Sequence, residues 1–186
     1  IVGYYQLAGS YYVRAVRRLV GGSWTSITSL DSASSSNPIN GVAVGIDSAG
    51  TSTIVWNKYV PASFASRIRG VTLTSAQTSG SGSDLYSAND STGSRLAVNE
   101  AGDAVIAFYY WNGARDLVGS LSKPAGGSWG TFTSLAGTGG TVSGYSVGID
   151  SSGIATAAWN RSNGTNTITQ AATRPAGAAS TWSAAT

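Results

Sequence analysis

Few side chains of this 186-residue chain could act as acids, bases or nucleophiles. The chain contains no His and no Cys, which excludes Ser–His and Cys–His catalysis, disulfides and most transition-metal sites. Asp84, Asp90 and Asp116 could supply paired carboxylates for glycoside hydrolysis, but no spacing brings two of them together. No turn carries the closely spaced carboxylates of a calcium loop. We therefore expect a protein that is not an enzyme and that has no cofactor and no metal.

Aromatic residues beside Asn and Arg give the stronger chemical signal. The chain has 6 Trp and 9 Tyr, and sugars are held by aromatic platforms together with a few polar side chains. Tyr110 and Trp111 lie outside the phase of the repeat described below and beside an Asn-Gly turn, so we expect them to be exposed. The predicted carbohydrate site draws on six residues: Tyr110, Trp111, Asn112, Arg115, Asn160 and Arg161.

A hairpin pattern occurs three times and must position these side chains. Residues 43–56, 95–108 and 146–159 each contain two apolar runs joined by an Asp- or Asn-initiated turn that ends in Gly. A glycine at the φ > 0 position is typical of tight hairpin turns. The turn glycines are 52 and 51 residues apart (102 − 50 and 153 − 102), which indicates a repeat architecture. The predicted structural residues of these hairpins are Asp47, Gly50, Trp56, Asn99, Gly102, Phe108, Asp150, Gly153 and Trp159.

A second motif recurs in the later half of three units, and the unit at 42–94 has lost its tryptophan. Residues 17–24, 122–129 and 173–182 read RRLVGGSW, SKPAGGSW and TRPAGAASTW. Their tryptophans, Trp24, Trp129 and Trp182, are predicted to belong to the structural skeleton. Asn112-Gly113 is a strong two-residue hairpin signal between the second and third strands.

The two motifs together predict about four strands in each unit of about 51 residues. Fourth strands are expected at 84–87, 128–135 and 181–185, and polar loops at 31–41, 58–66 and 80–94. Four-stranded antiparallel units of this length are the blades of a β-propeller. We therefore expect one all-β domain, a β-propeller of about four blades or part of a larger one. Its approximate units are 1–41 (incomplete), 42–94, 95–141 and 142–186.

The chain resembles bacterial extracellular β-propeller repeats, which alternate a V-x-V-D-x-x-G-x-A-x-x-x-W hairpin with an R-P-A-G-G-x-W turn. The matching copies are residues 147–159 with 174–182, and residues 44–56; the second hairpin departs from the pattern at Asn99 and Phe108. The resemblance implies a secreted, extracellular repeat protein and says little about activity, because propellers host many functions.

The composition argues against nucleic acid as a partner and against a membrane span. The net charge is +3 and only 10% of the residues are charged, unlike the dense basic face of nucleic-acid binders. No apolar run approaches the roughly 20 residues of a transmembrane helix. We expect a non-catalytic binding or adhesion module, lectin-like toward carbohydrate. A scaffold whose loops dock a surface protein, or which self-assembles as a homo-oligomer, is the alternative, and a glycan-processing hydrolase remains a third.

Overall fold

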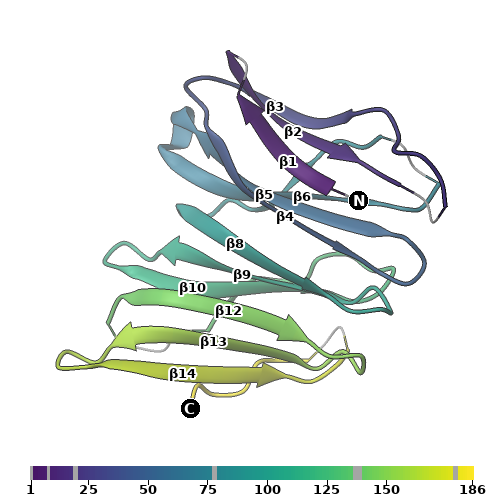
Figure 1. Ribbon diagram of the computed structural model, residues 1–186. Coiled ribbons are helices and arrows are strands. Elements are labelled where there is room, and N and C mark those ends of the chain that lie inside the picture. Colours follow the sequence, from purple (N-terminus) through teal and green to yellow (C-terminus); the bar gives the residue numbers. More distant parts are fainter. Residues whose placement is uncertain (1, 8, 19–20, 77–78, 136–139, 178–179) are drawn as a thin grey trace. The chain divides into compact units, whose positions relative to one another are not determined.

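The described part of the chain consists of β-strands, turns and connecting segments. The computed structural model describes residues 1–186 except 1, 8, 19–20, 77–78, 136–139 and 178–179. Over these residues there are four antiparallel sheets and no α-helix, with a single 3-10 turn at Pro61–Ser63 (Figure 1). The described residues divide into two compact units, Ile1–Ser94 and Arg95–Thr186, where the sequence leads us to expect one domain.

The first unit contains a three-stranded and a four-stranded sheet. The strands of the three-stranded sheet are β1 (Val2–Leu7), β2 (Ser10–Val16) and β3 (Thr28–Ser34). Those of the four-stranded sheet are β4 (Ile39–Ile46), β5 (Ser52–Val60), β6 (Ala65–Leu73) and β7 (Ser83–Tyr86). In both sheets each strand pairs with the next one along the chain.

The second unit also contains one four-stranded and one three-stranded sheet, but here the four-stranded sheet comes first along the chain. Its four-stranded sheet contains β8 (Ser91–Val98), whose first four residues precede the boundary between the units, β9 (Ala104–Trp111), β10 (Asp116–Lys123) and β11 (Thr133–Ser134). Its three-stranded sheet contains β12 (Val142–Ile149), β13 (Ala155–Ser162) and β14 (Thr167–Arg174). Each sheet falls within one of the four predicted units, except that β4 and β8 begin before residues 42 and 95.

The three repeated hairpins fold as their sequences predict. In the first, the Asp47 carboxylate accepts a hydrogen bond from the Thr51 amide at 2.7 Å, and in the third Asp150 accepts one from the Ile154 amide at 2.8 Å. Asn99 takes the same position in the second hairpin, where its side-chain oxygen accepts bonds from the Gly102 and Asp103 amides. The turn glycines have φ of 79°, 96° and 84° at positions 50, 102 and 153, a region that side chains with a Cβ disfavour.

Apolar residues from facing sheets form the core of each unit. In the first unit β4 lies against β1 and β2, and the buried cluster there comprises Val13, Ala15, Leu30, Ile39, Ile54, Trp56 and Leu73. In the second unit β12 lies against β9 and β10. The first strand of a repeated hairpin thus covers the neighbouring sheet in both units. The aromatic residues that end the hairpins, Trp56, Phe108 and Trp159, are at most 1% exposed.

Strands enter all three predicted polar loops, so the predicted loop bounds were too wide, although β7 lies where a fourth strand was expected. Residues 31–34 belong to β3 and residues 39–41 to β4. Residues 58–60 and 65–66 extend β5 and β6, and residues 83–86 and 91–94 lie in β7 and β8. Polar side chains in these strands find partners on other strands, as Asp31 does in its ion pair with Lys58. Polar residues can therefore lie in a sheet when their hydrogen-bonding groups are paired.

The fourth strand predicted at 84–87 is confirmed as β7, whereas the other two predicted fourth strands are shorter than expected. Residues 128–135 contribute only β11, and residues 181–185 form no regular strand. The end of the chain still runs beside β14, because the Ser183 amide bonds the Thr173 carbonyl at 2.7 Å and Ala171 and Thr186 exchange two amide–carbonyl bonds at 3.0 Å. Two of the four sheets are therefore three-stranded: the first belongs to the unit predicted as incomplete, and the last lacks its predicted fourth strand.

The repeated tryptophans of the turn motif are less buried than a structural skeleton requires. Trp24 is 53% exposed and lies outside any strand, where it forms an isolated bridge with Arg18. Trp129 and Trp182 are partly exposed. Trp24 therefore does not lie in the core.

Across the described residues, no helix is both long enough and apolar enough to cross a membrane.

Candidate functional site

Strand β9 places two aromatic side chains on one face of its sheet. Tyr109 and Trp111 are two residues apart, and because successive side chains alternate between faces they share a face, roughly 7 Å apart. Trp111 pairs with Asp116 of β10, and Tyr109 pairs with the buried Val118. Directly paired residues of antiparallel strands lie on the same face, so Asp116 stands beside Trp111. Trp111 is 44% exposed, and Asp116 is exposed.

Strand β12 adds a third ring. Tyr145 meets Tyr109 edge to face, with ring centroids 4.5 Å apart and an interplanar angle of 79°, the geometry that aromatic quadrupoles favour. Burial raises the pKa of Tyr145 to about 12, an effect that the positive charge of Arg95 partly offsets. Burial also raises the pKa of Tyr109, with opposing contributions from Arg95 and Asp116. Both phenols are therefore neutral at physiological pH and present apolar rings with hydroxyl groups.

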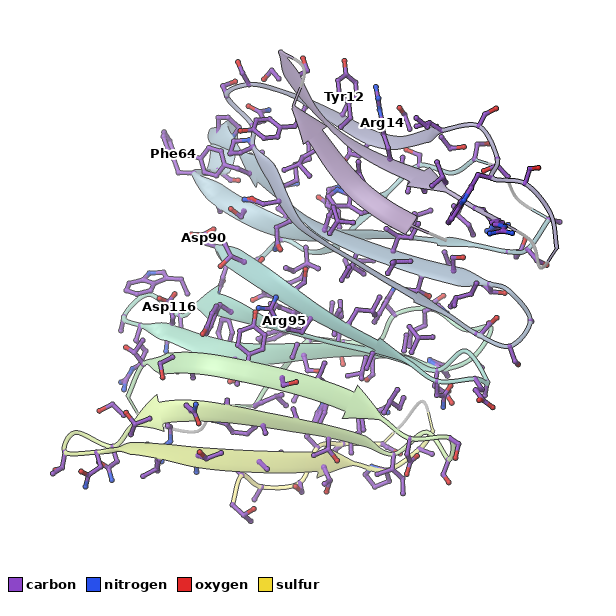
Figure 2. The ribbon with its side chains drawn as sticks, viewed as in Figure 1. Tyr12, Arg14, Phe64, Asp90, Arg95 and Asp116 are labelled. Carbon is purple, nitrogen blue, oxygen red and sulfur yellow. The ribbon has the colours of Figure 1, made fainter. Side chains whose placement is uncertain are left out.

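Strand β8 supplies a cation. The Arg95 guanidinium lies 5.8 Å from the centroid of the Tyr145 ring, within cation–π range, and the residue is exposed. Figure 2 shows Arg95 and Asp116 on their separate strands. We call Arg95, Tyr109, Trp111, Asp116 and Tyr145 the aromatic cluster. It combines three rings with one positive and one negative side chain, all from the second unit.

A separate shallow groove lies on the face of the β12–β14 sheet opposite the Tyr145 ring, because Gly144, Asn160 and Thr169 pair with one another while Tyr145 pairs with Trp159. It is lined by residues of β12, β13 and β14: Gly144, Tyr145, Ser146, Ala158, Trp159, Asn160 and Thr169. Asn160 is exposed, and its side-chain oxygen accepts a hydrogen bond from the Thr169 hydroxyl at 2.8 Å. Gly144 lies opposite Asn160 in the register of β12 and β13, and its missing side chain leaves the groove open at that point.

Tyr110 is not part of an exposed platform, and that prediction was wrong. The residue is 6% exposed and faces the opposite side of the sheet from Tyr109. Its hydroxyl lies 2.6 Å from the Ser134 hydroxyl, and its ring packs edge to face on Phe132 at 4.9 Å. Tyr110 is therefore a core residue with a satisfied hydroxyl.

The other predicted residues have individual placements. Asn112 shapes its turn, because its side-chain oxygen accepts bonds from the Ala114 and Arg115 amides at 3.0 Å. Arg115 is partly exposed in the same turn. The Arg161 guanidinium donates to the Gln170 side chain and to the Ser162 carbonyl. Of the six predicted residues, the structure brings Trp111 into the aromatic cluster, whereas Asn160 lines the separate groove on the other face of the β12–β14 sheet.

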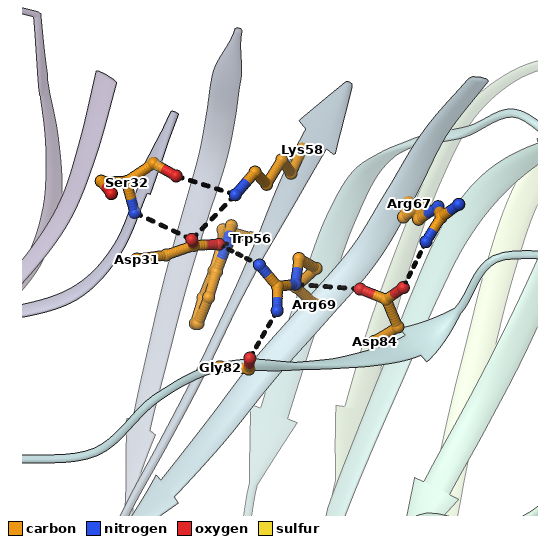
Figure 3. Close-up of polar contacts among 8 residues, drawn as sticks. All are labelled: Asp31, Ser32, Trp56, Lys58, Arg67, Arg69, Gly82 and Asp84. Atoms are coloured by element: carbon orange, nitrogen blue, oxygen red, sulfur yellow. Dashed lines mark hydrogen bonds and ion pairs between the residues drawn. The ribbon is translucent and has the colours of Figure 1, made fainter. Parts of the chain in front are cut away.

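The first unit has a charged cluster of a different kind, shown in Figure 3. Asp31 on β3 accepts bonds from the Trp56 indole at 3.0 Å, from the Lys58 ammonium at 2.9 Å and from the Arg69 guanidinium. Arg69 also bonds the Gly82 carbonyl and pairs with Asp84, which in turn pairs with Arg67. Since every carboxylate here accepts bonds from donors of the chain itself, the cluster ties β3 to β5, β6 and β7.

The remaining acidic residues do not assemble into a metal site. Among the residues that the structure describes, no three His, Cys, Asp or Glu side chains come together. Asp90 accepts a bond from the Ser66 amide at 2.6 Å, and Asp103 accepts bonds from the Ala125 amide and the Asn99 side chain at 3.0 Å.

Sequence reasoning missed Arg95, Tyr109 and Tyr145, although the repeat carried a signal for them. In the other hairpins the position of Tyr109 holds Asn57 and Asn160, and that of Arg95 holds Ala43 and Ser146. Large or charged residues at positions where the other copies are small or amide-bearing mark a departure from the structural repeat.

Comparisons with known proteins add little. No protein-family model matches the chain, and no curated protein matches it. Among solved structures the chain is similar to a mutant of the NanB sialidase from Streptococcus pneumoniae, with 11% identity and a TM-score of 0.49. The match covers 93% of this chain and 28% of that one. At this level of similarity it carries no argument about function.

Proposed function

We propose that the chain is a non-catalytic carbohydrate-binding module whose site is the aromatic cluster. The observation that carries the proposal is the exposed Trp111 indole beside the neutral Tyr109–Tyr145 pair, with Arg95 and Asp116 at its border. The C–H faces of a pyranose ring would stack on the indole. Asp116 would accept hydrogen bonds from sugar hydroxyls and Arg95 would donate them.

Two features of the cluster favour binding over hydrolysis. Asp116 is the single carboxylate of the cluster. Most glycosidases instead use two carboxyl groups, one acting as an acid, which lie about 5–9.5 Å apart. The pKa of Tyr145 is raised to about 12, which disfavours the phenolate that a nucleophilic tyrosine would need. A glycan-processing hydrolase is the alternative, and release of reducing sugar from a bound glycan would identify it.

The finer fold is part of the same proposal. We infer that the four sheets are blades of a β-propeller, because β4 on β1 and β2, and β12 on β9 and β10, repeat one mode of face-to-face packing. The module is proposed to act outside the cell, in line with the resemblance to extracellular repeats. A crystal structure showing sheets that do not follow a common axis would refute the propeller.

A protein-docking role is the second candidate, and Phe64 favours it. This ring is 84% exposed at the turn between β5 and β6, and exposed aromatic residues are common anchors of protein interfaces. Loss of partner capture in Phe64→Ala, with glycan binding unchanged, would assign docking to this turn.

The test of the carbohydrate site is a glycan array followed by calorimetry on the best glycan. Trp111→Ala is expected to weaken binding roughly 10- to 100-fold, because removing a central aromatic contact costs about 1.4–3 kcal/mol. Trp24→Ala is the matched control, since Trp24 is similarly exposed but lies in the other unit. Equal loss in both variants would remove the aromatic cluster as the site.

A further inference from the structure

A small pocket lies where the two sheets of the second unit come together at their hairpin-turn ends. It is lined by the start of β9, the ends of β10, β12 and β14, and the turn at Gly153. Three of its lining residues are charged: Asp103, Lys123 and Arg174. The pocket has room for roughly one water-sized sphere. We call it the turn pocket; it shares no residue with the aromatic cluster.

The turn pocket has an excess of positive charge. Lys123 is 7% exposed and Arg174 is 8% exposed, so little of either side chain is in contact with bulk water. Asp103 is the one carboxylate, and its two oxygens already accept bonds from the Ala125 amide and the Asn99 side chain. Two positive charges against one negative charge leave a net charge of +1 among the residues that line the pocket.

Lys123 differs from the cations at the same position of the other repeats. Arg18 donates from Nε to the Gly22 carbonyl at 2.8 Å, and Arg174 donates from Nη2 to the Gly177 carbonyl at 2.7 Å. Each guanidinium thus closes the turn that follows its strand. Lys123 occupies this position after β10, but no described side chain or carbonyl is hydrogen-bonded or ion-paired to its ammonium. The turn after β10 is closed instead by the Gly127 amide on the Pro124 carbonyl at 3.0 Å.

We propose that the turn pocket binds one monovalent anion of halide size between the Lys123 ammonium and the Arg174 guanidinium. The anion neutralises the excess charge and supplies the acceptor that Lys123 lacks. Because Lys123 ends β10 and Arg174 ends β14, the bound anion links the two sheets of the unit. Its effect is to stabilise the second unit in a halide-dependent way.

The test compares thermal unfolding in chloride or bromide with unfolding in methanesulfonate at the same ionic strength. The wild-type midpoint is expected to rise saturably with halide, by roughly 5 °C at tenfold excess over the dissociation constant. Lys123→Met removes the positive charge. Lys123→Arg introduces a guanidinium that can bond the carbonyl of its own turn, as Arg174 bonds Gly177. Both variants are expected to lose the halide dependence. Arg161→Gln removes a cation of the same unit outside the pocket and should retain it.

Crystals grown in bromide provide a readout that does not depend on variant folding. An anomalous peak between Lys123 and Arg174 is expected in the wild type and not in Lys123→Arg. The proposal is overturned if the wild-type midpoint is the same in halide and methanesulfonate, if all variants share one halide response, or if the pocket contains only water.

Discussion

Trp56 and Trp159 occupy the same position of two repeated hairpins, and replacing each by Phe separates hydrogen bonding from packing. Both side chains are buried, at 0% and 1% exposure. The Trp56 indole nitrogen donates to the Asp31 carboxylate at 3.0 Å. The Trp159 indole nitrogen is buried and has no acceptor among the described residues. Trp56→Phe therefore deletes a bond, whereas Trp159→Phe deletes an unsatisfied donor.

The expected difference in the free energy of unfolding follows from these contacts. Losing part of a buried ring costs a similar amount in both variants, so packing largely cancels. A hydrogen bond to a charged group contributes about 1.5–3 kcal/mol, and an unsatisfied buried donor costs about 1–3 kcal/mol. Trp56→Phe should therefore destabilise the protein by about 3 kcal/mol more than Trp159→Phe does.

Urea unfolding followed by far-ultraviolet circular dichroism measures this difference without relying on the fluorescence of the replaced tryptophan. The order of the two midpoints is the decisive observation. If Trp159→Phe loses as much stability as Trp56→Phe, the hydrogen bond from Trp56 to Asp31 makes no net contribution to stability. The charged cluster of the first unit would then not tie β3 to β5 in the way described.

Three further perturbations test other parts of the structure. Gly153→Ala should lower the free energy of unfolding, measured in urea, more than Gly164→Ala does. Both glycines have positive φ, but only at Gly153 would a Cβ meet other atoms, at 3.1 and 3.2 Å. Equal losses would refute the close packing at Gly153. Phe64 has φ of 49°, so Phe64→Gly should raise the free energy of unfolding by about 0.5–1 kcal/mol, and a decrease would contradict the strain. The pKa of Tyr145 is raised from 10.0 to about 12, so the stability that its neutral phenol contributes is present below pH 10 and is lost between pH 10 and 12. Tyr145→Phe should flatten the decline in the free energy of unfolding over this range by up to about 2 kcal/mol, and an unchanged slope would contradict the raised pKa.

The hairpins could be predicted from sequence because their information is local. Asp47 and Asp150 bond amides four residues away, so residue type and spacing within one turn determine the geometry. The polar strand ends could not be predicted in the same way. Asp31 lies in a strand because Lys58 and Arg69 neutralise it, and those partners are 27 and 38 residues away.

The candidate site was predictable only in part. Phe108 takes the position of the buried Trp56 and Trp159, so alternation already implies that Tyr110 is buried beside it and that Tyr109 and Trp111 share the other face. The proximity of Tyr145 and Arg95 could not be predicted, because it depends on how β12 packs on β9. The sequence therefore identifies Trp111, and tertiary packing adds the second tyrosine and the cation.

Calorimetric titration of the best array glycan into wild type, Trp111→Ala and Trp24→Ala tests the central claim most directly. We predict measurable binding by the wild type, a 10- to 100-fold weaker affinity for Trp111→Ala and an unchanged affinity for Trp24→Ala. The absence of binding to every glycan, or undiminished binding by Trp111→Ala, would contradict the assignment of carbohydrate binding to the aromatic cluster.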